Sequence, residues 1–153
     1  KENYSLNETG IVIQLHIVSM FLPSLITGNL LKKFGHSRII YAGVVFFALT
    51  IILSFLEPSF FNYIFALVFL GIGWNFLYLS GTGLLVLSYR DEEKFKAQGF
   101  NDVLVFSIQA LASLSAGYML SMTSWKTMNL IAIPFLVLIV FSSIRADLSK
   151  NDK

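Results

Sequence analysis

The chain has 153 residues, of which 56% are hydrophobic and only 13% are charged, and its formal net charge is +2. An ordinary soluble domain carries about 25% charged residues, so this composition leaves too little polar surface to cover a water-soluble globule. The eleven basic residues form no dense patch, which argues against nucleic-acid binding. The chain has no cysteine, which excludes a disulfide framework and a thiolate metal site within it.

Five long apolar runs, nearly free of charge, fill most of the sequence. About 20 apolar residues cross the hydrocarbon core of a bilayer as a helix, and each run is close to that length or longer. We therefore predict an all-α, polytopic transmembrane helical bundle in which residues 1–153 form a single membrane domain. The predicted spans are 10–31, 39–56, 60–89, 99–122 and 127–144.

The basic residues between the spans predict the side of the membrane on which each end lies. Taking alternate polar segments together places nine basic residues on one side and two on the other. Because Lys and Arg are enriched in cytoplasmic loops, we predict that the chain before residue 10 lies outside a plasma (inner) membrane and that the tail from residue 145 lies inside. The nine are Lys32, Lys33, Arg38, Arg90, Lys94, Lys96, Arg145, Lys150 and Lys153, and the two are Lys1 and Lys126.

The first span carries polar side chains and a proline near its middle. Pro23 has no N–H to donate, so we expect the helix to break there and to free a backbone carbonyl. His16 is the only histidine within the spans, and an imidazole that titrates near neutral pH suits a proton relay or a ligand. The alternative is a structural hydrogen bond from His16 to a neighbouring helix. A metal role is not expected, because no suitable second ligand lies near His16 in the sequence.

The second and fifth spans are almost wholly apolar, and a helix that is apolar on all sides can face lipid. By contrast, the first, third and fourth spans hold polar side chains at depth. Such groups are expensive in a bilayer and normally face the interior of a bundle or a wet cavity. We therefore expect the first, third and fourth spans to surround an interior and the other two to lie outside them.

Trp74 and Asn75 lie near the middle of the third span. We predict that they line a central cavity, with Gln109 of the fourth span opposite them and His16 as a further candidate. The alternative is an interhelical hydrogen bond from Asn75, with Trp74 packed against lipid. Glycines at positions 71, 73, 81 and 83 bracket the pair and permit close helix approach or bending.

The fourth span combines an acid with a pattern of small residues. Asp102 lies one turn inside the predicted start of the span, where the helix macrodipole favours an acid. An acid within a membrane span is also a candidate for gating or ion coupling. Farther along, Ala112 and Ala116, and likewise Ser113 and Gly117, are four residues apart, which predicts close packing against another helix.

The loop between the first two spans reads Gly-Asn-Leu-Leu-Lys-Lys-Phe-Gly-His-Ser-Arg over residues 28–38. Its glycines permit a tight turn and a close helix approach, and its basic residues hold it at the cytoplasmic face. The loop resembles the G-x-L-x-D-R-x-G-x-R-R signature of the major facilitator superfamily, although Lys32 stands in place of Asp and Ser37 in place of one basic residue. The matching positions are Gly28, Leu30, Lys33, Gly35 and Arg38. With the segments 16–28, 71–76 and 97–102, the resemblance covers about residues 10–145.

The resemblance implies a partial major facilitator superfamily fold and membership of a bacterial permease group. Members of that family have twelve spans in two halves, and a chain that starts outside and crosses five times matches helices eight to twelve or two to six. The departures from the signature and the short polar tail favour helices eight to twelve, in the C-terminal half. The implied function is secondary active transport of a small solute by alternating access, with a proton as the expected coupling ion.

The partners implied by the resemblance are the lipid bilayer, an unidentified small molecule and an N-terminal half of the same polypeptide. Asp102 and Pro23 are then the gating or coupling candidates, and Asp102 is expected to pair with basic loop residues of the other half. A non-transporting structural or channel-like membrane protein is the alternative, although no filter-like stretch is present. An enzyme is not expected, because H-E-x-x-H and G-x-S-x-G are absent, and no cofactor is implied.

Overall fold

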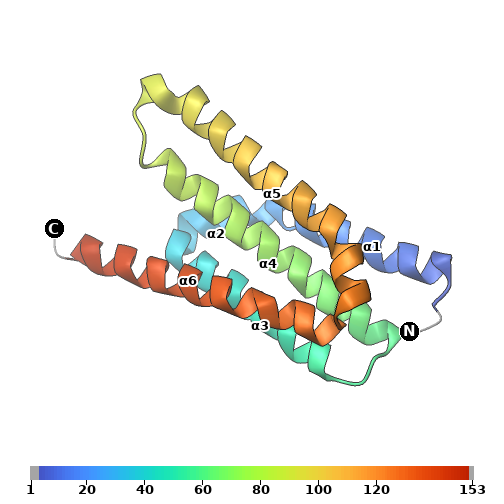
Figure 1. The fold of residues 1–153 in the computed structure, drawn as a ribbon. Helices are drawn as coiled ribbons and strands as arrows, with labels where there is room; N and C mark the ends of the chain where they lie inside the picture. The colour runs from blue at the N-terminus through green and yellow to red at the C-terminus, as the bar shows by residue number, and fades with distance from the viewer. Residues whose placement is uncertain (1–3, 152–153) are drawn as a thin grey trace.

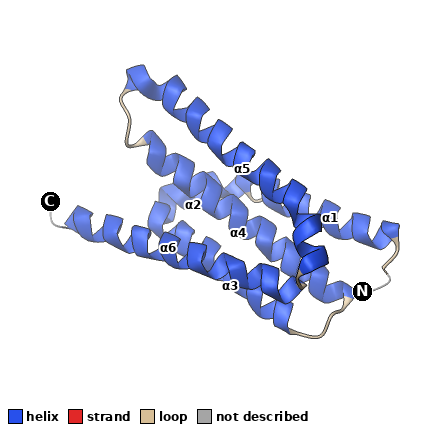
Figure 2. Cartoon of the chain, in the orientation of Figure 1, coloured by secondary structure: helices blue, strands red, loops and turns tan. Residues whose placement is uncertain are grey.

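The structure is a computed structural model that describes the backbone of residues 4–151 and the side chains of residues 4–145. Within this part of the chain every regular element is a helix and no strand is found (Figure 2). Lys1 and Lys153, two residues used to predict the orientation, lie outside the described residues, as does the side chain of Lys150. The helices are α1 (Leu6–Phe21), α2 (Ser24–Phe34), α3 (His36–Phe55), α4 (Phe60–Val86), a short 3-10 helix η1 (Asp91–Glu93), α5 (Lys94–Met122) and α6 (Trp125–Asn151).

Five helical segments of the described chain are long and apolar enough to cross a membrane, which confirms the predicted all-α bundle of five spans. The first segment, Leu6–Phe34, consists of α1 and α2 together. The other four are His36–Phe55, Phe60–Val86, Asp91–Met122 and Trp125–Arg145.

Helix α4 lies at the centre of the bundle (Figure 1). Helix α3 packs along one side of α4, and α1 and α2 pack along another. Helix α6 rests mainly on α3, whereas α5 touches α4 and α6 only over short stretches. The central position of α4 brings the polar side chains of the first and third spans into contact.

Helices α3 and α4 approach closely because small residues face each other. A methyl group on Gly73 would lie 3.0 Å from the carbonyl oxygen of Gly43 and 2.7 Å from Cδ2 of Phe47. About two turns farther along α4 toward its start, the carbonyl oxygen of Ala66 accepts a hydrogen bond of 3.0 Å from the Thr50 hydroxyl. Lipid supplies no hydrophobic drive between helices, so this close packing and the polar contact hold the pair together.

The packing differs from the expectation for the second and fourth spans. Helix α3, expected to lie outside, is the main partner of α4, although Val45 and Ile52 on its far side are 57% and 58% exposed. Helix α5 has no buried residue, and a methyl group on Gly117 would meet no atom within 4 Å. The close packing predicted for the small residues of α5 is therefore wrong for this structure. Close packing needs small residues on both helices, and Gly43 with Gly73 supplies that match between α3 and α4.

Local sequence sets the ends of the first helices. The backbone N–H of Glu8 donates to Oγ of Ser5 at 3.2 Å, and the Ser5 N–H donates to Oε2 of Glu8 at 2.8 Å, which is a capping box at the start of α1. Gly35 joins α2 to α3 with a φ of 82°, in the region that favours glycine. This glycine allows α3 to begin immediately after α2 ends.

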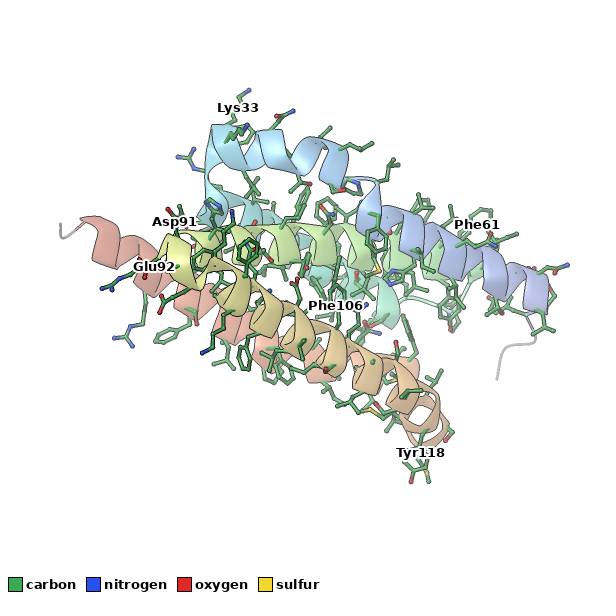
Figure 3. The ribbon with its side chains drawn as sticks, turned by 90° about the horizontal axis from the view of Figure 1, so that it is seen from above. Lys33, Phe61, Asp91, Glu92, Phe106 and Tyr118 are labelled. Carbon is green, nitrogen blue, oxygen red and sulfur yellow. The ribbon has the colours of Figure 1, made fainter. Side chains whose placement is uncertain are left out.

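Charged residues gather at one end of the bundle (Figure 3). Lys33, Asp91 and Glu92 lie at that end, whereas Phe61 lies toward the opposite one. The α2–α3 turn and the α4–α5 loop therefore share one side of the bundle, as five spans in alternating directions require.

Candidate functional site

The first span breaks at Pro23, as the sequence predicts. Helix α1 ends at Phe21, and α2 begins at Ser24. Because proline cannot donate a backbone hydrogen bond, carbonyl groups in the last turn of α1 have no donor within their own helix. The Ser24 hydroxyl donates to one of them, the carbonyl of Phe21. The break thus leaves backbone acceptors that side chains must satisfy inside the membrane.

Asn75 of α4 ties both sides of this break to the centre of the bundle. Its Nδ2 donates to the carbonyl oxygen of Met20 on α1 at 2.8 Å, and its Oδ1 lies 2.8 Å from the hydroxyl of Thr27 on α2. The same hydroxyl lies 2.8 Å from the Pro23 carbonyl, and its single proton serves one acceptor at a time. Asn75 is 2% exposed and Thr27 is fully buried. The amide therefore makes the interhelical contact that was the alternative to a cavity position.

His16 also connects α1 to α4, one turn of α1 before Met20. Its Nδ1 lies 2.7 Å from the carbonyl oxygen of Leu67. A carbonyl only accepts, so Nδ1 carries the proton in this contact. The carbonyl of His16 itself accepts from the Ser19 hydroxyl at 2.7 Å, and a methyl group on Gly71 would lie 2.8 Å from that carbonyl. The histidine thus bonds to a neighbouring helix at a place where the two backbones lie close together.

Four aromatic side chains from three helices form a continuous row, which we call the aromatic row: Phe21, Trp74, Tyr78 and Phe106. Trp74 and Tyr78 are stacked, with ring centroids 4.8 Å apart and an angle of 10° between their planes. The Phe21 ring lies 6.2 Å from Trp74, and the Phe106 ring lies 6.1 Å from Tyr78. Figure 3 shows Phe106 where α5 passes α4. The row therefore crosses α1, α4 and α5.

Asp102 stands beside the aromatic row on α5. Its Oδ1 lies 3.3 Å from the Tyr78 hydroxyl and 3.3 Å from Nδ2 of Asn101. Helix α5 begins at Lys94, so Asp102 lies about two turns inside it. The helix macrodipole stabilises acids only within the first turn. Because α5 begins five residues before the predicted start at residue 99, Asp102 lies too far along the helix for the stabilisation by the macrodipole that the sequence predicts. In the structure, the main interaction of the Asp102 carboxylate with another helix is its contact with the Tyr78 hydroxyl.

Gln109, the other candidate on α5, is half-buried, and its Oε1 is buried without a hydrogen-bond partner among the described residues. Asn75 directs its polar atoms to α1 and α2 and not to α5. The connection from α4 to α5 instead runs from Trp74 through Tyr78. Of the four predicted cavity candidates, Trp74 alone belongs to the aromatic row.

The residues that match the signature occupy the second half of α2, the turn and the first residues of α3: Gly28, Leu30, Lys33, Gly35 and Arg38. A methyl group on Gly28 would meet nothing within 4 Å, so the close helix approach expected at this glycine is not present. The close approach occurs instead at Gly83 of α4, where a methyl group would lie 2.5 Å from Nε2 of His36. The turn thus packs on the end of α4 through its histidine.

A pocket of about 880 Å³ opens at the opposite end of the bundle, between α1, α4, α5 and the α3–α4 turn. Glu8, Tyr63 and Ser121 are among its lining residues, and the Tyr63 ring lies 5.7 Å from that of Trp125. None of the predicted cavity candidates lines this pocket. Among the residues that the structure describes, no group of three or more His, Asp or Glu side chains could hold a metal ion.

Phe21, Tyr78 and Phe106 are not among the site residues predicted from the sequence, although one sequence signal points to Tyr78. Trp74 and Tyr78 are four residues apart, which places them on the same face of a helix. Their partners on α1 and α5 depend on how those helices cross α4, and a single sequence does not give that crossing.

A bundle of five apolar spans, with a broken first span and polar side chains bonded between helices, is that of an integral multi-pass membrane protein. The sequence profile of the Major Facilitator Superfamily matches residues 2–152. The chain therefore belongs to the major facilitator superfamily of transporters.

Curated relatives agree with this assignment. The chain is 35% identical over 137 residues to the riboflavin transporter RfnT of Brucella anthropi, which is 90% of this chain and 34% of that protein. It is also 35% identical to two uncharacterized MFS-type transporters of Bacillus subtilis, YddS over 83% and YdeG over 84% of this chain, each match covering 30% of the relative. The chain thus spans about a third of the length of these relatives. No solved structure matches it significantly.

Proposed function

We propose that this chain is the five-helix part of a secondary active transporter that moves a small solute by alternating access. Family membership and the length of the relatives support the proposal, as does the named riboflavin transporter among them. Transporters of this kind bind solute near the midplane, beside broken helices, and expose the site to each side of the membrane in turn. We assign the five spans to helices eight to twelve of a twelve-helix protein, on the departures from the signature in the α2–α3 turn.

The aromatic row is the observation that carries the proposal. Gly73, which contacts α3, and Tyr78 are five residues apart on α4, which corresponds to about 140° around a helix. The row therefore lies on the side of α4 that faces away from α3. Phe21 and Phe106 are 59% and 49% exposed, so the row presents aromatic surface beyond this chain. We propose that this surface, with Trp74, forms part of the solute path.

The chemistry of the row favours a flat aromatic solute. Aromatic rings gain about 0.5–1.5 kcal/mol from stacked or edge-to-face contact beyond the burial of their surface. The Asp102 carboxylate on α5 lies beside the row and supplies a polar group to orient a solute. The name of the relative RfnT makes riboflavin, a flat heterocycle, the first solute to test.

Orientation and coupling complete the proposal. The basic residues support a cytoplasmic position for the α2–α3 turn and the α4–α5 loop, and we propose the plasma (inner) membrane as the location. Asp102 is the acid beside the row, and we assign it the gating or coupling role with a proton as the ion. When ionised it only accepts from the Tyr78 hydroxyl, and when protonated it donates as well, so a proton changes the bonding at the row.

The test is uptake by the full-length protein that contains this chain. Purified protein in liposomes with an imposed proton gradient is expected to accumulate labelled riboflavin, and Trp74→Ala is expected to weaken its apparent affinity about tenfold. Phe61→Ala is the matched control, because Phe61 is an exposed aromatic residue of the same helix at the far end of the bundle. Equal effects of the two substitutions would refute the role of the row. Failure to accumulate any of a panel of solutes would refute active transport.

A further inference from the structure

A second hollow, a groove of about 560 Å³, runs between α3 and α6 on the side of α3 that α4 does not cover. Every residue that lines it is apolar, including Ala48 and Ile52 of α3 and Ile133, Leu136 and Phe141 of α6. These two helices form the second and fifth spans, the most apolar of the five. A groove without a polar group has nothing to orient a polar solute, so its occupant is a hydrocarbon.

The length of the groove identifies the kind of hydrocarbon. Its lining on α6 extends from Ile133 to Ile144, and eleven steps of 1.5 Å rise give about 16 Å. The hydrocarbon core of a bilayer is about 30 Å thick, so the groove extends across about one leaflet. A further transmembrane helix would need a contact surface along the whole span, whereas one acyl chain fits this length.

A cation stands at one end of the groove. Arg145 follows Ile144 directly, and its guanidinium carbon lies 5.7 Å from the ring centroid of Phe141, a lining residue. Tyr41 precedes Val44, the lining residue nearest this end of α3, by three residues and so lies on the same helix face. Arginine and tyrosine are typical of the interface where lipid headgroups lie, and an interfacial cation attracts anionic lipid.

We propose that the groove between α3 and α6 binds one acyl chain of an anionic phospholipid, and that the phosphate of this lipid lies at Arg145. In the proposed orientation the lipid belongs to the cytoplasmic leaflet. The site is independent of the solute path, because it lies on the side of α3 that faces away from the aromatic row.

The experiment counts lipids that stay bound to the full-length protein. Protein purified with equal amounts of phosphatidylglycerol and phosphatidylcholine is analysed by native mass spectrometry, and the wild type is expected to retain phosphatidylglycerol preferentially. Arg145→Gln should lower that retention about fivefold, the effect of about one interfacial cation. Lys126→Gln is the matched control, since Lys126 also lies over a phenylalanine ring, 5.9 Å from the centroid of Phe55, away from the groove. It should leave retention unchanged.

A second pair of variants tests the groove itself. Ala48→Phe places a ring in the groove and should abolish lipid retention, whereas Val45→Phe adds bulk to the same helix outside the lining and should not. Size-exclusion chromatography of both variants checks that they remain folded, and the Arg145→Gln test does not depend on them because that side chain is exposed. Equal retention in Arg145→Gln and Lys126→Gln would overturn the headgroup site. A wild-type protein that retains neither lipid would overturn the whole proposal.

Discussion

The amide of Asn75 is expected to hold both parts of the broken first span against α4. Asn75→Leu keeps a side chain of similar size but leaves the Met20 carbonyl without its donor and the Thr27 hydroxyl with only the Pro23 carbonyl. A buried polar group without a partner costs about 1–3 kcal/mol, and interhelical hydrogen bonds in membrane proteins average about 0.6 kcal/mol. We therefore expect the free energy of unfolding of the full-length protein to fall by about 1–2 kcal/mol.

A double-mutant cycle isolates the contact between Asn75 and Thr27. Asn75→Leu, Thr27→Val and the double variant are compared by reversible unfolding in mixed micelles, with an expected coupling of about 0.6 kcal/mol and an upper value of about 1.7 kcal/mol. Thr50→Val is the control, because Thr50 is equally buried and its hydroxyl donates to Ala66, not to Asn75. Effects of Asn75→Leu and Thr50→Val should add. Zero coupling between Asn75 and Thr27, or the same coupling in both cycles, would refute the reasoning.

Three further predictions concern packing, an unpaired hydroxyl and the acid. Gly71→Ala should destabilise the protein by about 1–3 kcal/mol, because its methyl group would lie 2.8 Å from the His16 carbonyl. Gly81→Ala is the control, since its methyl group would face open space, and it should change stability by no more than about 0.5 kcal/mol. Equal melting temperatures of the two variants would contradict the close α1–α4 contact. Ser80→Ala removes a hydroxyl buried without a partner in the described structure, so stability in the same assay should be unchanged or rise by up to about 1 kcal/mol, and a clear loss would reveal a partner. Asp102→Asn should slow transport by the full-length protein without lowering the amount inserted, measured by uptake and by immunoblot of membranes, and unchanged uptake would remove its proposed role.

The sequence predicts the fold well because the bilayer imposes strong local rules. An apolar run of sufficient length must be a helix, since every backbone group needs a partner within the membrane, and Pro23 must interrupt it. The packing of the helices does not follow from these rules. Gly43 and Gly73 make α3 the main partner of α4, and their match appears only when the two helices are placed together.

In the candidate site, too, the sequence predicts which side chains need partners but does not predict which partners they find. Depth in the membrane predicted that Asn75 and His16 need partners, and the structure supplies them as the Met20 and Leu67 carbonyls. Which carbonyl receives each side chain depends on the helix break and on the crossing of α1 and α4. The sequence predicts that Trp74 faces an interior. Its stacking on Tyr78 depends on the side-chain conformations and on the rotation of α4, which only the structure gives.

Alternating access at the aromatic row is tested most directly by chemical accessibility at Phe106. The chain contains no cysteine, so Phe106→Cys in a full-length protein whose other cysteines are replaced gives a single reactive thiol. Phe135→Cys is the control, because Phe135 is an exposed residue of α6, the most apolar span. We predict that a membrane-impermeant maleimide labels Phe106→Cys from both sides of the membrane and Phe135→Cys from neither. A Phe106→Cys thiol that stays unlabelled from both sides, like the control, would contradict a solute path along the aromatic row.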